Sequence, residues 1–189
     1  MEINAVEKTR NSLRDLFKSL FWPAAAGSVF WSFCTILTRL PSELTEPEVL
    51  SSLIILFMLT TYLSLGWLMS YEKTPPQLPA KFWIFDCIHI CAIVFAALSA
   101  VENFSLLNKT SLFFFGATTV GHVVGAWELD APKPKDRWCL AMINCAGVII
   151  ILLGDQLSIN PWQLPASYVV VIAIWFIYRR RIIKELFCK

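Results

Sequence analysis

The sequence predicts an all-α protein, a polytopic membrane bundle of six helices, and three observations support this fold class. The 189 residues are 57% hydrophobic and 16% charged, with a mean hydropathy of +0.60. Soluble domains are about half apolar and a quarter charged. The apolar residues fall in long blocks separated by short polar segments, and Lys and Arg gather in every second segment. That alternation is typical of multi-pass membrane proteins.

Six apolar blocks are long enough to cross the hydrocarbon core of a bilayer, which takes about 17 to 25 residues. The predicted spans are residues 19–38, 49–71, 82–101, 110–128, 138–154 and 162–178. Together they form a predicted transmembrane bundle over residues 19–178. The segments between the spans are too short to enclose a hydrophobic core, which excludes a soluble enzyme.

The distribution of basic residues predicts that both termini lie in the cytoplasm. With six spans, the four inner segments hold 4, 2, 3 and 5 basic residues, which is 14 of the 16 in the chain. The outer loops hold only Arg39 and Lys109. Lys and Arg favour the cytoplasmic side, so the chain is expected to be an integral membrane protein, in a bacterial inner membrane.

Amphipathic segments flank the predicted bundle at both ends. In residues 1–18, apolar side chains recur at helical spacing between charged ones, which predicts a cytoplasmic helix on the inner leaflet or against a partner. Residues 179–189 form a basic tail that is predicted to continue the last helix into the cytoplasm. Simple anchoring of the topology also explains both segments.

Polar residues inside the predicted spans form a candidate site, because ionisable side chains are costly in a bilayer. They are Asp86, His89, His122 and Asn144. Both histidines of the chain lie at a similar depth, roughly 9 to 11 Å from the predicted cytoplasmic ends of their helices, at 1.5 Å per residue. Asp86 and His89 are three residues apart, so they share one helix face.

Three interpretations of this cluster are open. In the first, the polar side chains hydrogen-bond between helices, and Gly121 and Gly125 set a close helix crossing. In the second, Asp86, His89 and His122 form a proton or ion relay, or the two histidines bind a metal ion. In the third, His89 and His122 are the axial ligands of a b-type haem.

The sequence shows no catalytic motif, so we expect a non-enzymatic membrane subunit without a cofactor. It would form homo-oligomers and dock a soluble cytoplasmic protein, as the anchor or sensor of a multi-protein system such as a bacterial defence system. The alternatives are a transporter or channel for an ion, proton or small solute, and a haem subunit. A net charge of +2 gives no reason to expect nucleic-acid binding. The predicted docking residues are Lys133, Lys135, Arg137, Arg179, Arg180, Arg181 and Lys184.

Overall fold

The computed structural model describes residues 17–39, 45–73, 80–128, 134–156 and 162–187. Within these ranges the chain is almost entirely helical, with a π-helical turn η1 (Phe17–Phe21) and six α-helices. The α-helices are α2 (Trp22–Arg39), α3 (Glu46–Lys73), α4 (Ala80–Glu102), α5 (Phe104–Glu128), α6 (Pro134–Gln156) and α7 (Gln163–Phe187). The predicted all-α class is therefore confirmed, whereas residues 1–16 of the predicted amphipathic segment lie outside the described ranges.

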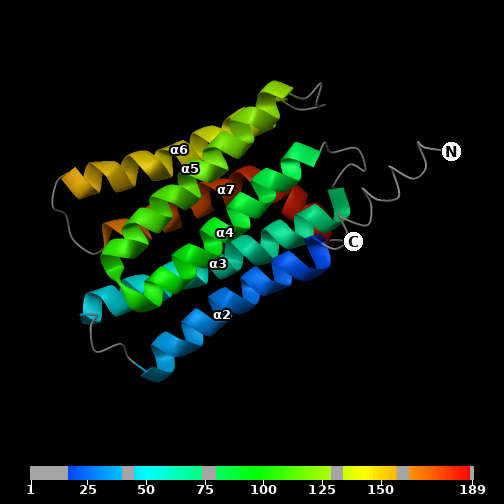
Figure 1. The fold of residues 1–189 in the computed structure, drawn as a ribbon. Helices are drawn as coiled ribbons and strands as arrows, with labels where there is room; N and C mark the ends of the chain where they lie inside the picture. The colour runs from blue at the N-terminus through cyan, green and yellow to red at the C-terminus, as the bar shows by residue number, and fades with distance from the viewer. Residues whose placement is uncertain (1–16, 40–44, 74–79, 129–133, 157–161, 188–189) are drawn as a thin grey trace.

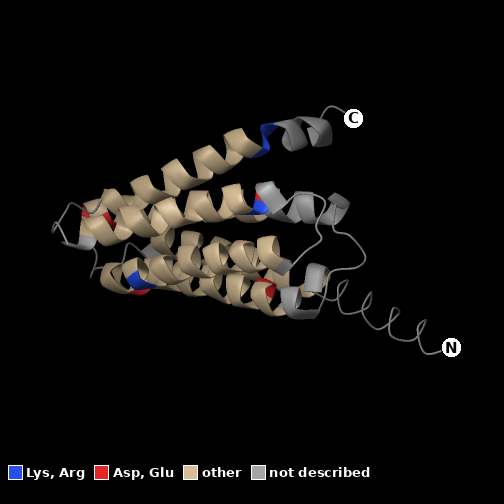
Figure 2. Cartoon of the chain, turned by 90° about the horizontal axis from the view of Figure 1, so that it is seen from above, with Lys and Arg blue, Asp and Glu red and all other residues tan. Residues whose placement is uncertain are grey.

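The α-helices lie side by side in one bundle, and successive helices are antiparallel (Figure 1). We call the end where α2, α4 and α6 begin, and where α3, α5 and α7 finish, the basic end of the bundle. α5 packs between α4 and α6, and α7 packs on α6 and α3. Charged side chains lie towards the two ends of the described helices, while the length between them is uncharged (Figure 2).

Four helices contain a segment that is long and apolar enough to cross a membrane. These segments are Ser19–Thr38, Glu46–Leu65, Ile84–Glu102 and Asp136–Gly154. α5 and α7 contain no such segment within the described residues, although each is 25 residues long. The described fold is thus compatible with a membrane protein.

The connection between α4 and α5 differs from the prediction. α5 begins at Phe104, six residues before the predicted span at 110–128, and Asn103 alone separates it from α4. The Asn103 Oδ1 atom accepts hydrogen bonds from the backbone N–H groups of Ser105 (2.8 Å) and Leu106 (3.2 Å). Asparagine at this position satisfies free N–H groups of the first helical turn, so the helix starts here, before the polar residues Asn108 and Lys109.

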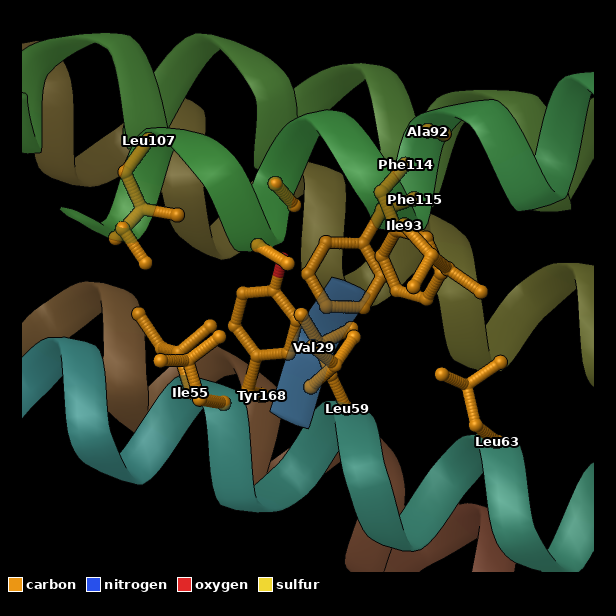
Figure 3. Close-up of a cluster of buried hydrophobic side chains, with 14 of the residues drawn as sticks. Val29, Ile55, Leu59, Leu63, Ala92, Ile93, Leu107, Phe114, Phe115 and Tyr168 are labelled. Carbon is orange, nitrogen blue, oxygen red and sulfur yellow. The ribbon is translucent and has the colours of Figure 1, made fainter. Parts of the chain in front are cut away.

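The core of the bundle includes an aromatic cluster between α5 and α7 (Figure 3). Phe114, Phe115 and Tyr168 are fully buried. The rings of Phe114 and Tyr168 stack, with centroids 5.9 Å apart and planes 7° apart. The Tyr168 hydroxyl donates a hydrogen bond to Ser111 Oγ at 2.9 Å, which satisfies its polar atom inside the core. Leu59 of α3 packs against the cluster.

Gly147 of α6 allows α5 and α7 to approach the middle of that helix. A Cβ atom at position 147 would lie 3.0 Å from the Phe115 ring and 3.0 Å from Val171 Cγ2. Both neighbours are buried, so little room exists for them to move aside. The missing side chain therefore sets how closely three helices pack.

Candidate functional site

A cavity of about 140 Å³ lies near the basic end of the bundle. It is lined by residues of α2, α3, α4, α5 and α6, namely Trp22, Tyr62, Phe85, Asp86, His89, Ala117, Thr118, Gly121, His122 and Arg137. At about 30 Å³ per water molecule, this volume holds four or five waters or one small ligand. The Asp86 side chain is exposed, so the cavity is reached from the surface.

The structure brings together three of the four polar residues that the sequence singled out. Asp86 and His89 of α4 and His122 of α5 line the same cavity, and the two histidines are close enough to interact electrostatically. Asn144 lies apart from them. Its buried amide donates a hydrogen bond to the Leu140 carbonyl of its own helix at 2.8 Å.

His89 is held by Thr118, a residue that the sequence analysis missed. Its Nδ1 atom lies 2.9 Å from Thr118 Oγ1, and that hydroxyl also donates to the Phe114 carbonyl at 2.7 Å. A hydroxyl has one proton to donate, so His89 donates from Nδ1 and keeps a lone pair at Nε2. The imidazole also contacts the rings of Tyr62 and Phe114, with centroids 5.6 and 5.3 Å away. These contacts fix its orientation.

His122 differs from His89 in its partners. Among the described residues, no hydrogen bond to its ring is present, although the ring lines the cavity. Its interactions there are electrostatic, with His89, Arg137 and Arg179. A ring nitrogen of His122 is therefore available to a ligand.

Arg137, one of the predicted docking residues, lines the cavity. Its side chain is half-buried and attracts Asp86 electrostatically. It packs on Gly125, where a Cβ atom would overlap the guanidinium group. Gly125 thus makes room for the Arg137 side chain. Gly121 instead packs against α4, because a Cβ atom at position 121 would lie 3.7 Å from Phe85 Cβ.

Arg179 of α7 does not line the cavity, and its guanidinium carbon lies 5.8 Å from the centre of the Tyr178 ring. Arg179 interacts electrostatically with Tyr62, His122 and Arg137, all of which line the cavity. Its Nε atom is buried and has no hydrogen-bond partner among the described residues. Arg180, in contrast, is exposed. The other predicted docking residues cannot be placed, because Lys133 and the side chains of Lys135, Arg181 and Lys184 fall outside the described part of the chain.

The cavity is small for a ligand-binding pocket. Pockets for drug-sized ligands measure about 300–1,000 Å³, and this one measures about 140 Å³. No group of three His, Cys, Asp or Glu side chains that could hold a metal ion is present in the described ranges. The residues present fit a smaller polar ligand.

The arrangement offers such a ligand a carboxylate, one guanidinium group and imidazole nitrogens within one partly apolar enclosure. Groups of this kind bind small polar molecules through charge-assisted hydrogen bonds, which are stronger than neutral ones. Inference about function depends on this geometry, because no protein family, curated protein or solved structure matches the chain.

Proposed function

We propose that this chain is a six-span, non-enzymatic membrane protein that senses a small polar ligand and acts through a soluble partner docked at its cytoplasmic face. The observation that supports this most directly is the polar cavity, to which five helices contribute side chains. Ionisable residues at membrane depth are costly and usually mark a functional site.

The two helices without a strongly apolar segment complete the six spans. α5 lies between α4 and α6, both candidate spans, and α7 packs on α6 and α3. A helix of 25 residues is about 37 Å long, which exceeds the ~30 Å hydrocarbon thickness. Polar residues of α5, such as Ser111 and Thr118, are buried inside the bundle, so they do not meet lipid.

Charge and aromatic placement support a cytoplasmic basic end. The predicted inner segments hold 14 of the 16 basic residues, as the positive-inside rule requires. Trp127 and Trp138 lie near the same end of the bundle, with ring centroids 6.4 Å apart in an edge-to-face contact. Indole rings favour the membrane–water interface.

Sensing is favoured over transport because aromatic side chains close the inner side of the cavity. Phe114 contacts His89 and stacks on Tyr168, and Phe115 packs against Tyr168 with centroids 4.8 Å apart. All three aromatic rings are fully buried. A solute in the cavity would therefore meet a close-packed core rather than a polar path across the described bundle.

α7 provides a physical link between the cavity and the proposed docking surface. It is one continuous helix from Gln163 to Phe187. Trp175 contacts Tyr62 of the cavity, with ring centroids 5.5 Å apart, and Arg179 lies one turn further along. The basic residues of the predicted tail follow directly on the same helix, so a shift of α7 on ligand binding would reach a docked partner.

Filling the cavity tests the sensing proposal. Ala117→Leu places a larger side chain in the lining, and we expect the variant to lose its bound small molecule. Wild type and variant would be extracted in lipid nanodiscs, and the molecules released on denaturation would be compared by mass spectrometry. We expect a near-stoichiometric molecule from wild type and at least a tenfold lower yield from the variant.

Ala173→Leu is the matched control, because Ala173 is an exposed residue of α7. It should release the same molecule as wild type. Equal release from wild type, Ala117→Leu and Ala173→Leu would show that the cavity holds no ligand, and the proposal would fail.

Reversing the charge of the tail tests the docking proposal. Arg180→Glu, Arg181→Glu and Lys184→Glu together should release a co-purifying soluble protein, because they replace cations with anions on the proposed docking surface. Insertion should persist, since Lys8 to Lys18 keep the N-terminus basic. The readouts are affinity purification from native membranes and membrane fractionation. If the variant retains its partners or no longer inserts into the membrane, the docking proposal fails and the tail serves only as an anchor.

A further inference from the structure

We infer that the ligand of the cavity is a small neutral aromatic molecule, a single ring with a hydroxyl or N–H group that donates a hydrogen bond to His89. The inference rests on the proposed sensing function and names the chemical class of its ligand. It is supported by the charge balance of the cavity, by its ring-rich walls and its volume, and by one imidazole nitrogen that remains open.

The charges of the lining favour a neutral ligand over an ion. Asp86 provides one carboxylate and Arg137 one guanidinium group, so with neutral histidines the formal charges of the ten lining residues cancel. A site that selects an ion presents the opposite charge to it. This lining has no such excess, so shape and hydrogen bonding are left to select the ligand.

Planar rings dominate the walls of the cavity. Five of the ten lining residues carry one, namely Trp22, Tyr62, Phe85, His89 and His122. They belong to four helices, α2 to α5, so rings line the cavity from several sides. Aromatic rings pack favourably on one another in offset or edge-to-face contacts. The walls therefore suit a planar ring.

The volume of the cavity matches one such ring. It is about 140 Å³, and an apolar protein cavity of about 150 Å³ binds one benzene molecule. A ring that fills this space removes the aromatic walls from contact with water, which is favourable. The expected ligand is thus monocyclic, with one small polar substituent.

His89 sets the polar requirement on this ligand. Its Nδ1 atom lies 2.9 Å from Thr118 Oγ1, which leaves Nε2, on the opposite edge of the ring, as an acceptor. No hydrogen bond to Nε2 is present among the described residues. An acceptor in a partly apolar enclosure costs free energy when it lacks a donor. A hydroxyl or N–H group on the ligand supplies that donor.

Equilibrium dialysis of labelled phenol against the full chain in lipid nanodiscs tests the inference. Phenol also dissolves in lipid, so Ala117→Leu, which fills the lining, measures this background. Wild type should show a single saturable site above the background. Ala173→Leu should bind phenol as wild type does, because Ala173 is exposed on α7.

His89→Phe tests the hydrogen bond, because phenylalanine keeps a ring at position 89 but has no acceptor. The competitor is toluene, which has the size of phenol and a methyl group in place of the hydroxyl. The preference for phenol over toluene should fall about fivefold in His89→Phe, as expected for one lost hydrogen bond. Ile88→Phe is the matched control, since Ile88 is 37% exposed on α4 and does not line the cavity. It should keep the preference of wild type.

Cyclohexanol tests the aromatic requirement on wild type without any substitution. It keeps the hydroxyl but lacks the aromatic ring, so it should displace labelled phenol several-fold more weakly than unlabelled phenol does. The inference fails if the two compounds compete equally, or if wild type binds no more phenol than Ala117→Leu. An equal preference for phenol in His89→Phe and Ile88→Phe would also contradict it.

Mass spectrometry of the molecules released from the nanodiscs separates this failure from that of the sensing proposal. If wild type binds no phenol but releases a molecule that Ala117→Leu lacks, the sensing proposal stands and the ligand belongs to another chemical class. If wild type neither binds phenol nor releases such a molecule, both proposals fail.

Discussion

Phe114→Ala is expected to lower the free energy of unfolding by about 3 kcal/mol, the lower range for truncating a buried aromatic residue. Phe114 is fully buried and contacts the rings of Tyr62, His89, Phe115 and Tyr168. Lipid supplies no hydrophobic driving force between helices, so packing contacts carry much of the stability of a membrane bundle. Removing the ring would leave a cavity that its neighbours cannot fill.

Equilibrium unfolding in mixed micelles, followed by circular dichroism, would measure this loss. Phe113→Ala is the control, because the neighbouring ring is 49% exposed on the outside of the bundle. It should change the free energy of unfolding by less than about 0.5 kcal/mol, as surface substitutions usually do. Similar losses in both variants would mean that Phe114 is not at the centre of the core.

Gly147→Leu is expected to destabilise the bundle by about 3 kcal/mol, at the upper end of the usual cost of overpacking. Even the first atom of the new side chain would lie 3.0 Å from both Phe115 and Val171. Because these neighbours belong to α5 and α7, the substitution would push two helices away from α6. The same unfolding measurement applies.

Gly27→Leu separates this packing effect from the effect of leucine on a helix. Gly27 is exposed on α2, and a Cβ atom there would meet nothing within 4 Å. Leucine favours helix over glycine by up to about 1 kcal/mol, so the variant should be as stable as wild type or slightly more stable. A loss of stability in Gly27→Leu comparable to that in Gly147→Leu would contradict the assignment of Gly147 to a helix interface.

Hydropathy predicted the helices well, because a membrane helix is visible as an uninterrupted apolar block. The observed helices contain all six predicted blocks except for the ends of the first and last, where residues 19–21 belong to η1 and Trp162 precedes α7. The start of α5 was predicted six residues too late, because Asn108 and Lys109 lower the local hydropathy without breaking a helix. A capping interaction such as that of Asn103 depends on backbone geometry, which hydropathy does not measure.

The candidate site was only partly predictable. Asp86, His89 and His122 stand out in the sequence, since each is an ionisable residue in an apolar block. Nothing in the sequence distinguishes Arg137 from other basic residues near a helix start. The path of its side chain depends on the space beside Gly125, which only the packed structure shows. Thr118 was missed for a similar reason: threonine is common in membrane helices, and its bond to His89 depends on the rotation of α5 against α4.

The single residue between α4 and α5 has a consequence for insertions and deletions. Phe85 and Gly121 face each other at equal distances from Asn103, 18 positions on either side (103 − 85 and 121 − 103), and His89 and Thr118 lie 14 and 15 positions away. Asn103 therefore fixes the register between α4 and α5, the two helices of a helical hairpin. One residue inserted after Asn103 and incorporated into α5 would rotate α5 by about 100° and shift it by about 1.5 Å along its axis. The Phe85–Gly121 and His89–Thr118 pairs would then separate. The hairpin should tolerate changes in many side chains far better than any change in its length.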